Sequence, residues 1–196
     1  LRSEVAKIEE PPYLAAVLVG DDSGSRRFLE LKKKAAEGIG IDFRIYEFAG
    51  NISNSELRKK LNQIVKATTC GGMIIELPLP AHLNTQHILN SVSEQKDPDV
   101  LSQKAQAAFF AGRSKILPPS AEAIKSIFEE RRIEPKGKTA VIFGYGLLVG
   151  KPVSHWLLSQ GAAVTVINEF TPEPAELSKK ADIIISGVGK PGLVKS

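Results

Sequence analysis

Two side chains of one predicted helix, Phe28 and Lys32, could together bind a flat ligand. They stand four residues apart, so they share a face of the helix. An aromatic ring can stack on a planar ligand, and an amine beside it can transfer a proton or stabilise negative charge. The same spacing also fits a core phenylalanine next to a surface lysine, so the pair alone does not define a site.

Carboxylates follow at two other places in the same half of the chain. Glu76 comes at the end of an apolar run, where a carboxylate is unusual unless it is paired or lies at the strand tip. Ligands gather at the carboxyl ends of parallel strands, so this position is a candidate for ligand binding. Asp99 closes the acidic segment Lys-Asp-Pro-Asp at residues 96–99, which equally fits ordinary turn chemistry.

A glycine-rich turn at residues 143–152 reads Phe-Gly-Tyr-Gly-Leu-Leu-Val-Gly-Lys-Pro and follows a strand-like apolar run. The glycines Gly144, Gly146 and Gly150 would let the backbone approach a ligand, and the first turn of the next helix would direct N–H groups at an anion. Pro152 suits the first turn of a helix. This order predicts a phosphate cradle, although many tight strand-to-helix turns bind nothing.

An acidic residue, Glu169, follows the next predicted strand, about 20 residues past the glycine turn. A carboxylate at this place can accept hydrogen bonds from an adenosine ribose. It would also repel a 2′-phosphate, so it favours NAD over NADP. The alternative is an exposed loop glutamate without a ligand.

Apolar runs alternate with amphipathic segments along the whole chain, which indicates a parallel α/β architecture with two lobes. We expect strands over residues 14–20, 42–48, 72–77, 139–143, 163–167 and 182–186. We expect helices over residues 25–40, with Ser25 as the N-cap, 53–66, 84–92, 120–131, 153–159 and 174–180.

The division predicted is an N-terminal catalytic domain over 1–118, a connecting helix and linker over 119–136, and a Rossmann-like nucleotide domain over 137–196. The last domain holds three predicted strands, whereas a doubly wound nucleotide domain usually has about six. We therefore expect this domain to be incomplete.

The composition narrows the class of protein. Hydrophobic residues make up 42% and charged residues 24%, and no apolar run approaches the roughly 20 residues that cross a bilayer. We therefore expect no membrane partner. One cysteine fits a reducing compartment, so we expect a cytoplasmic protein. The net charge of +4 comes without interleaved aromatic residues, which argues against a nucleic-acid partner. His82, His87 and His155 form no convincing set of metal ligands, so no metal is expected.

Several segments, in chain order, resemble the bifunctional methylenetetrahydrofolate dehydrogenase/methenyltetrahydrofolate cyclohydrolase family. The more specific ones are Leu-Pro-Leu-Pro at 77–80, Val-Gly-Lys-Pro at 149–152 and Gly-Val-Gly-Lys-Pro at 187–191. The resemblance implies two α/β lobes with folate in the cleft between them, and a homodimer formed through the nucleotide lobe. It implies Lys32, Glu76 and Asp99 as catalytic residues, Phe28, Lys32, Glu76, Pro78 and Asp99 as substrate-binding residues, and Gly144, Tyr145, Gly146, Gly150 and Glu169 as cofactor-binding residues.

This chain departs from the family pattern in its folate half. Phe28 replaces the tyrosine that stacks on folate, and Glu76 replaces the glutamine beside the catalytic lysine. A carboxylate there would hold Lys32 protonated and impair hydrolysis of the methenyl bridge, or Glu76 would itself take the proton. Asp99 matches the aspartate that anchors the pterin, but the family's Asp-Val-Asp-Gly reads Asp-Pro-Asp-Val.

The nucleotide half departs as well. Tyr145 stands where the family has an arginine that grips a 2′-phosphate, and Glu169 stands where it has a small polar residue. Both changes favour NAD, or the absence of any cofactor. Ser120 corresponds to a family threonine and keeps its hydroxyl.

The resemblance therefore implies oxidation of methylenetetrahydrofolate to methenyltetrahydrofolate with NAD or NADP, with a possible second step of hydrolysis to formyltetrahydrofolate. Two alternatives stay open at this point. One is a degenerate homologue that binds folate or a nucleotide without turnover. The other is a two-domain oxidoreductase of the shikimate-dehydrogenase type, which also pairs a catalytic lysine with an aspartate.

Overall fold

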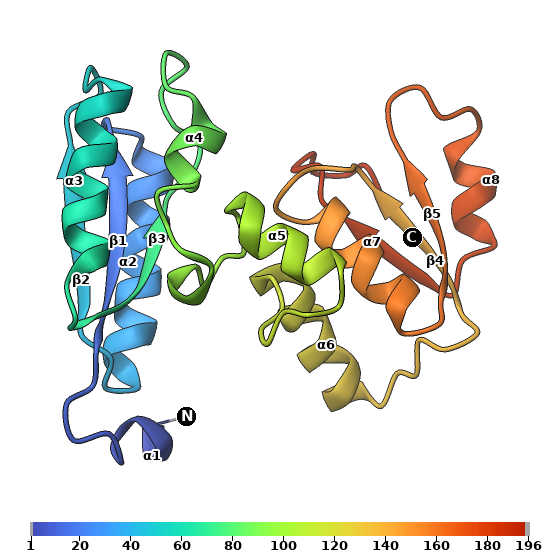
Figure 1. The fold of residues 1–196 in the computed structure, drawn as a ribbon. Helices are drawn as coiled ribbons and strands as arrows, with labels where there is room; N and C mark the ends of the chain where they lie inside the picture. The colour runs from blue at the N-terminus through green and yellow to red at the C-terminus, as the bar shows by residue number, and fades with distance from the viewer. Residues whose placement is uncertain (1, 195–196) are drawn as a thin grey trace. The chain divides into compact units, whose positions relative to one another are not determined.

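The computed structural model describes residues 2–194, and it divides into one unit up to Ile116 and a second from Leu117 onward. Each unit contains its own three-stranded parallel sheet (Figure 1). The α/β class with two parallel-sheet lobes is thus confirmed. Within residues 2–194, none of the helices is both long and apolar enough to cross a membrane.

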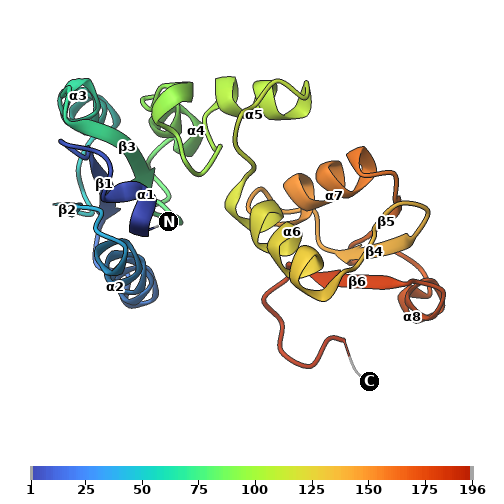
Figure 2. The same cartoon turned by 90° about the horizontal axis from the view of Figure 1, so that it is seen from below.

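The sheet of the first unit has the order β2-β1-β3, with β1 (Tyr13–Val19) in the centre. β2 (Phe43–Phe48) and β3 (Cys70–Ile75) pair with β1 on either side. Helices α2 (Ser23–Gly38) and α3 (Asn54–Lys66) lie on opposite faces of this sheet (Figure 2). Because β1 is covered on both faces, its run of Ala, Val and Leu is continuous and does not alternate with polar residues.

The core of the first unit forms where apolar side chains of the two helices meet this sheet. On one face, Leu29 and Ala36 of α2 pack with side chains of all three strands. Leu57 and Leu61, one turn apart in α3, are fully buried. The burial of Leu29 and Ala36 fixes α2 on the sheet, and with it the residues of α2 that lie near the sheet's carboxyl edge.

The caps of the two helices differ in how well they were predicted. Ser53 caps α3 as expected, since its hydroxyl accepts a hydrogen bond from Glu56 N at 3.2 Å. For α2 the prediction of Ser25 as N-cap was wrong. The cap is Asp22, whose Oδ1 accepts from Ser25 N at 2.7 Å, and the helix begins at Ser23.

Short helices complete the first unit. They are α1 (Arg2–Val5), α4 (Thr85–Leu89), the 3-10 helix η1 (Glu94–Lys96) and α5 (Gln103–Phe110). Of these only α4 was predicted, with longer bounds. Lys96 anchors η1 to the end of α3, because its Nζ donates to the carbonyl of Val65 at 2.7 Å and to that of Ala67 at 3.1 Å.

The second unit has the sheet order β5-β4-β6, formed by β4 (Thr139–Phe143), β5 (Ala163–Ile167) and β6 (Ile183–Ser186). Helix α7 (Gly150–Ser159) connects β4 to β5, and α8 (Pro174–Lys179) connects β5 to β6. The helix that was predicted as a connector, α6 (Pro119–Arg131), belongs to this unit. It packs on α7, where the rings of Phe128 and Trp156 lie 5.8 Å apart.

Candidate functional site

Three of the predicted site residues meet at the carboxyl edge of the first sheet. Glu76 directly follows β3, and its backbone N–H still donates to Val17 of β1 at 2.9 Å. Its carboxylate lies 2.8 Å from Nζ of Lys32, which extends from α2. The Phe28 ring, one turn earlier in α2, has its centroid 4.4 Å from the same ammonium. The arrangement joins an aromatic face, a cation and a carboxylate.

The Lys32–Glu76 pair is largely removed from solvent. The side chain of Glu76 is 8% exposed and that of Lys32 is 24% exposed, whereas Phe28 is 52% exposed. Removing one partner of such a pair leaves the other charge buried without compensation, which is costly. The exposed ring of Phe28 leaves a flat apolar surface beside a fixed charge pair.

Asp99 lies close enough to this pair to be influenced by it. Burial raises the pKa of Asp99 to about 6, while the positive charge of Lys32 opposes the rise and the charges of Asp97 and Glu76 add to it. The carboxyl of Asp99 therefore titrates near neutral pH, where it changes between a two-oxygen acceptor and a neutral acid.

The loop that presents Asp99 is held by its neighbour Asp97. The buried Oδ2 of Asp97 accepts hydrogen bonds from Leu101 N at 3.0 Å and from Ser102 N at 2.7 Å. Val100 lies between them with φ at 56°, in the left-handed region that a β-branched residue rarely adopts. The resemblance puts Val100 at the place of a glycine, the residue that adopts such a φ most easily.

Pro78 follows Glu76 by two residues, joined to Leu77 by a cis peptide bond. Its place just beyond β3 puts it in the segment that carries Glu76. Of the histidines considered as metal ligands, His82 makes a different contact: its Nε2 lies 2.9 Å from the carbonyl oxygen of Ile52. Across residues 2–194, we find no cluster of three or more His, Cys, Asp or Glu side chains suited to hold a metal ion.

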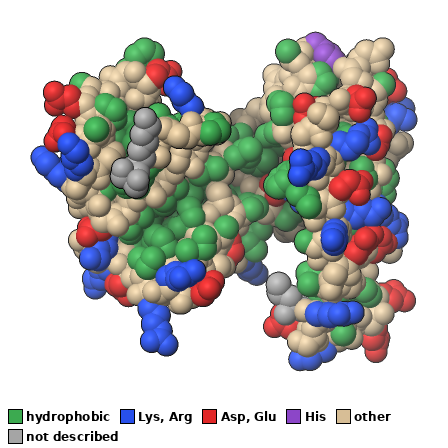
Figure 3. Space-filling model, turned by 180° about the vertical axis from the view of Figure 1, so that it is seen from behind, with side chains coloured by type: hydrophobic (Ala, Val, Ile, Leu, Met, Phe, Trp, Pro, Cys, Tyr) green, Lys and Arg blue, Asp and Glu red, His purple; other side chains and the backbone are tan. Residues whose placement is uncertain are grey.

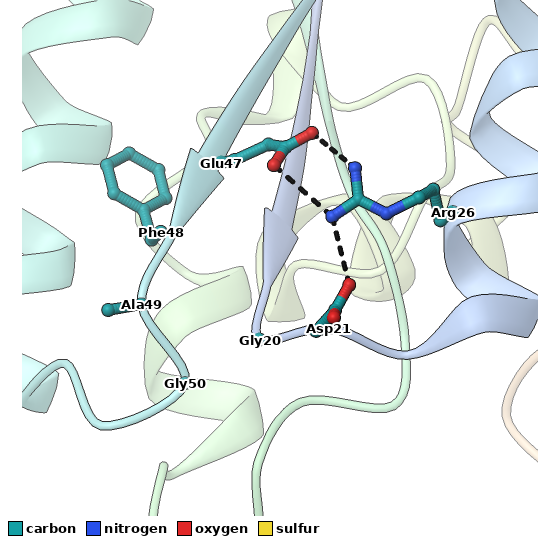
Figure 4. A pocket seen from close by; sticks show the side chains of 7 residues that line it. All are labelled: Gly20, Asp21, Arg26, Glu47, Phe48, Ala49 and Gly50. Carbon is teal, nitrogen blue, oxygen red and sulfur yellow. Dashed lines mark hydrogen bonds and ion pairs between the residues drawn. The ribbon is translucent and has the colours of Figure 1, made fainter.

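A charge cluster at the same sheet edge was not predicted. Arg26 of α2 binds Glu47 of β2 through two nitrogens, at 2.6 and 3.2 Å, and Asp21 at 3.2 Å (Figure 4). The guanidinium lowers the pKa of Glu47. These residues line a shallow pocket together with Gly20, Phe48, Ala49 and Gly50. Because Arg26 satisfies two carboxylates, the cluster ties α2 to the ends of β1 and β2.

The glycine turn of the second unit is built by close approach of backbone atoms. Gly144 has φ at +88°, and its N–H donates to the carbonyl of Ile167, the last residue of β5, at 2.7 Å. A Cβ on Gly150 would overlap the carbonyl oxygen of Gly144 and lie 2.7 Å from Cα of Tyr145. Only glycine therefore allows α7 to begin so close to the end of β4.

Gly146 differs from its neighbours because a Cβ there would meet no other atom within 4 Å. The turn is thus tightly packed at Gly150 and open at Gly146. The open backbone at Gly146 is the kind of surface that a pyrophosphate can approach. The hydroxyl of Ser120 donates to the carbonyl of Leu148 at 2.6 Å. This contact fixes the turn to the first residues of α6.

The two residues that were predicted to select the cofactor lie at the same edge of the second sheet. Tyr145 is 56% exposed, and the ammonium of Lys151 lies 5.6 Å from the centroid of its ring. Glu169 is exposed in the loop after β5. Lys151 therefore places a positive charge beside Tyr145.

A parallel sheet with a glycine turn between its first strand and helix defines the second unit as a nucleotide-binding fold of the Rossmann class. Family models agree with both units. The catalytic domain of tetrahydrofolate dehydrogenase/cyclohydrolase matches residues 1–99, and the NAD(P)-binding domain of the same family matches residues 118–196. The chain belongs to this family, which confirms the resemblance seen in the sequence.

Individual relatives agree. The chain is 34% identical over 194 residues to the bifunctional protein FolD of Bdellovibrio bacteriovorus, covering 97% of this chain and 67% of that protein. It is 31% identical over 183 residues to FolD of Clostridium botulinum, covering 93% of this chain and 65% of that protein. The chain therefore spans about two thirds of the length of these relatives.

Solved structures show the same fold. The bifunctional FolD of Campylobacter jejuni superposes with a TM-score of 0.91 at 31% identity, covering 98% of this chain and 68% of that one. The Trypanosoma brucei enzyme, solved with NADP and an inhibitor, gives a TM-score of 0.93 at 28% identity, covering 98% and 68%.

Proposed function

We propose that this chain catalyses the oxidation of methylenetetrahydrofolate to methenyltetrahydrofolate with a nicotinamide cofactor. The observation that carries the proposal is the cluster of Lys32, Glu76 and Phe28, with Asp99 in electrostatic reach, at one sheet edge of a member of this family. Family membership favours this function over that of a shikimate-type oxidoreductase.

In this proposal the first unit binds and orients the folate. The ionised carboxyl of Asp99 accepts two parallel hydrogen bonds from the pterin amide and amino groups. The exposed ring of Phe28 stacks on a flat portion of the substrate, and the Lys32 ammonium stabilises negative charge beside it. The cofactor, when bound, supplies the hydride acceptor, so the chain's own residues serve mainly to position the reactants.

The second unit would hold that cofactor. Gly144, Gly146 and Gly150 shape the backbone for the pyrophosphate, and Glu169 contacts the adenosine ribose. We infer NAD as the preferred form, because Glu169 repels a 2′-phosphate and Tyr145 supplies no charge to bind one. The ammonium of Lys151 near Tyr145 would attract a 2′-phosphate and so reduces the preference for NAD over NADP. By resemblance to the family, we also infer a homodimer formed through this unit.

Hydrolysis of the methenyl product is the second activity of the family, and in this chain we infer that it is the weaker one. Water must give up a proton during the attack, and the Lys32 amine is engaged by Glu76 at 2.8 Å. Replacing Lys32 with Met should abolish any hydrolysis, by at least about 100-fold, while folate binding stays detectable. Lys33→Met, on the neighbouring residue of the same helix, is the control and should leave hydrolysis unchanged.

The proposal is tested by following methenyltetrahydrofolate formation spectrophotometrically with methylenetetrahydrofolate and either NAD or NADP. Turnover that is lost in Asp99→Ala and kept in Glu94→Ala, a variant at an exposed nearby carboxylate, supports it. Tight folate binding without any absorbance change would instead establish a non-catalytic homologue.

A further inference from the structure

The large hydrophobic side chain with the highest exposure in the described part of the chain is Phe170, at 85%. It lies in the loop between β5 and α8 of the second unit. A phenylalanine ring presented to water forgoes the stabilisation that burial of its apolar surface would give. A single exposed apolar side chain is ordinary on a protein surface, but an aromatic ring at a sheet edge where ligands bind can stack on a flat ligand.

Hydrogen bonds on both sides of Phe170 hold the backbone that presents it. The Oδ1 of Asn168 accepts from Phe170 N at 3.0 Å and from the hydroxyl of Thr171 at 3.2 Å. The Oγ1 of Thr171 in turn accepts from Asn168 N at 3.0 Å. This Asx turn fixes where the ring leaves the loop, although the ring itself has little packing.

The loop starts beside the glycine turn. Ile167, the last residue of β5, accepts a hydrogen bond from Gly144 N at 2.7 Å, and Phe170 follows three residues later. Glu169, immediately before it, is the residue proposed to contact the adenosine ribose. In parallel α/β sheets a dinucleotide binds along this carboxyl edge, so the base attached to that ribose would lie near the loop that carries Glu169.

We propose that Phe170 is the residue of this chain that recognises the adenine of the dinucleotide, by stacking its ring on the base. The inference rests on the proposed function for the presence of a dinucleotide, and it adds a base-binding residue. Stacking does not depend on the 2′ position of the ribose. Phe170 therefore strengthens binding of NAD and NADP alike, whereas Glu169 distinguishes them.

The test measures binding of ADP and of nicotinamide mononucleotide to the full chain by titration calorimetry, with folding checked by circular dichroism. Phe170→Ala should weaken ADP binding about 5- to 100-fold, the range found when a stacking aromatic is truncated, and leave nicotinamide mononucleotide unaffected. Phe170→Tyr should retain ADP affinity. Leu158→Ala, at a 55% exposed apolar residue of α7, is the control and should change neither ligand.

A second measurement reports stacking directly. In proton NMR, the adenine resonances of ADP should move upfield on binding to the unmodified chain through the ring current, and this shift should disappear in Phe170→Leu. ADP affinity that is equal in the unmodified chain and Phe170→Ala would overturn the inference. An equal loss of affinity for ADP and nicotinamide mononucleotide in Phe170→Ala would also overturn it, because that indicates a structural role. So would a Phe170→Ala variant that changes from dimer to monomer while its ADP affinity stays intact.

The outcomes also separate this inference from the proposed function. An unmodified chain that binds neither ADP nor NAD contradicts both. ADP binding that depends on Phe170, in a chain without turnover of methylenetetrahydrofolate, supports the role of Phe170 and contradicts the dehydrogenase activity alone.

Discussion

Asp99 combines burial with a nearby charge pair, and this determines how stability should respond to pH. Burial raises its pKa from 3.8 to about 6, so the folded protein keeps this proton to a higher pH than the unfolded chain does. The stabilisation from this group is complete below the unfolded value and is lost as the pH rises through about 6.

Asp99→Asn should therefore gain stability relative to the unmodified chain as the pH rises from 4 to 7. The expected gain is on the order of 2–3 kcal/mol, because each pKa unit corresponds to about 1.4 kcal/mol. Urea unfolding at a series of pH values measures it. A stability difference that is independent of pH would show that Asp99 titrates as an exposed aspartate does.

Glu169 is the residue at which cofactor preference should change. Glu169→Ser removes a carboxylate that repels a 2′-phosphate, so the ratio of NADP to NAD efficiency should rise about tenfold, equivalent to about 1.4 kcal/mol. Steady-state kinetics with both cofactors measure the ratio. Glu134→Ser, at an exposed glutamate before β4, is the matched control. A ratio that is the same in all three proteins would remove Glu169 from the cofactor site.

At the scale of elements, the start of α7 depends on one glycine. Gly150→Ala should destabilise the protein by about 3 kcal/mol or more, because the added methyl overlaps the backbone of Gly144 and Tyr145. Gly146→Ala meets open space and should leave the melting temperature within a few degrees. Calorimetric melting of the two variants provides the comparison. Equal melting temperatures would contradict the tight turn described here.

Most strands and the longer helices were predictable because their hydrophobic patterns are local. The strands at residues 139–143 and 163–167 have the predicted bounds, and the cap of α3 follows from its Ser-x-x-Glu pattern. Helix α5 was missed, because its eight residues are short for a helical pattern and depend on tertiary anchoring through the loop that Asp97 holds.

The candidate site was predictable to a similar degree. The pairing of Lys32 with Glu76 was expected from the family resemblance, which puts Glu76 in the place of the lysine's glutamine partner, and the two side chains lie 2.8 Å apart. The cluster of Arg26 with Glu47 joins residues 21 apart with no shared motif, so only the fold reveals it. The exposure of Phe170 likewise depends on loop geometry that no periodicity encodes.

At the scale of the molecule, the boundary between the two units is exposed to proteases. Arg113 and Lys115 are both exposed, two residues apart, immediately before the division at Ile116. Trypsin at low concentration should cut here first and release fragments that correspond to the two units. Mass spectrometry of early time points identifies the cut, and Arg113→Gln with Lys115→Gln should abolish it. First cleavage inside α2 or α6 would contradict the division.

Exposed apolar side chains are plentiful on the second unit, and Figure 3 shows them as a continuous area on one of its faces. Ile184 of the edge strand β6 is 42% exposed, although its partner Val141 in β4 is buried. An area of this kind is typical of a surface that packs against further protein, from the same molecule or from another one. Sedimentation of the chain measures directly whether it forms the homodimer proposed above.

Each of the two sheets draws all its described strands from one continuous stretch of the chain. A genetic crossover placed between them therefore separates no hydrogen-bonded pair of strands. Chimeras that join residues 1–116 of this chain to the nucleotide unit of a relative would keep the ion pair of Lys32 and Glu76 while the unit proposed to bind the cofactor is exchanged. The two units are then open to recombination as separate modules.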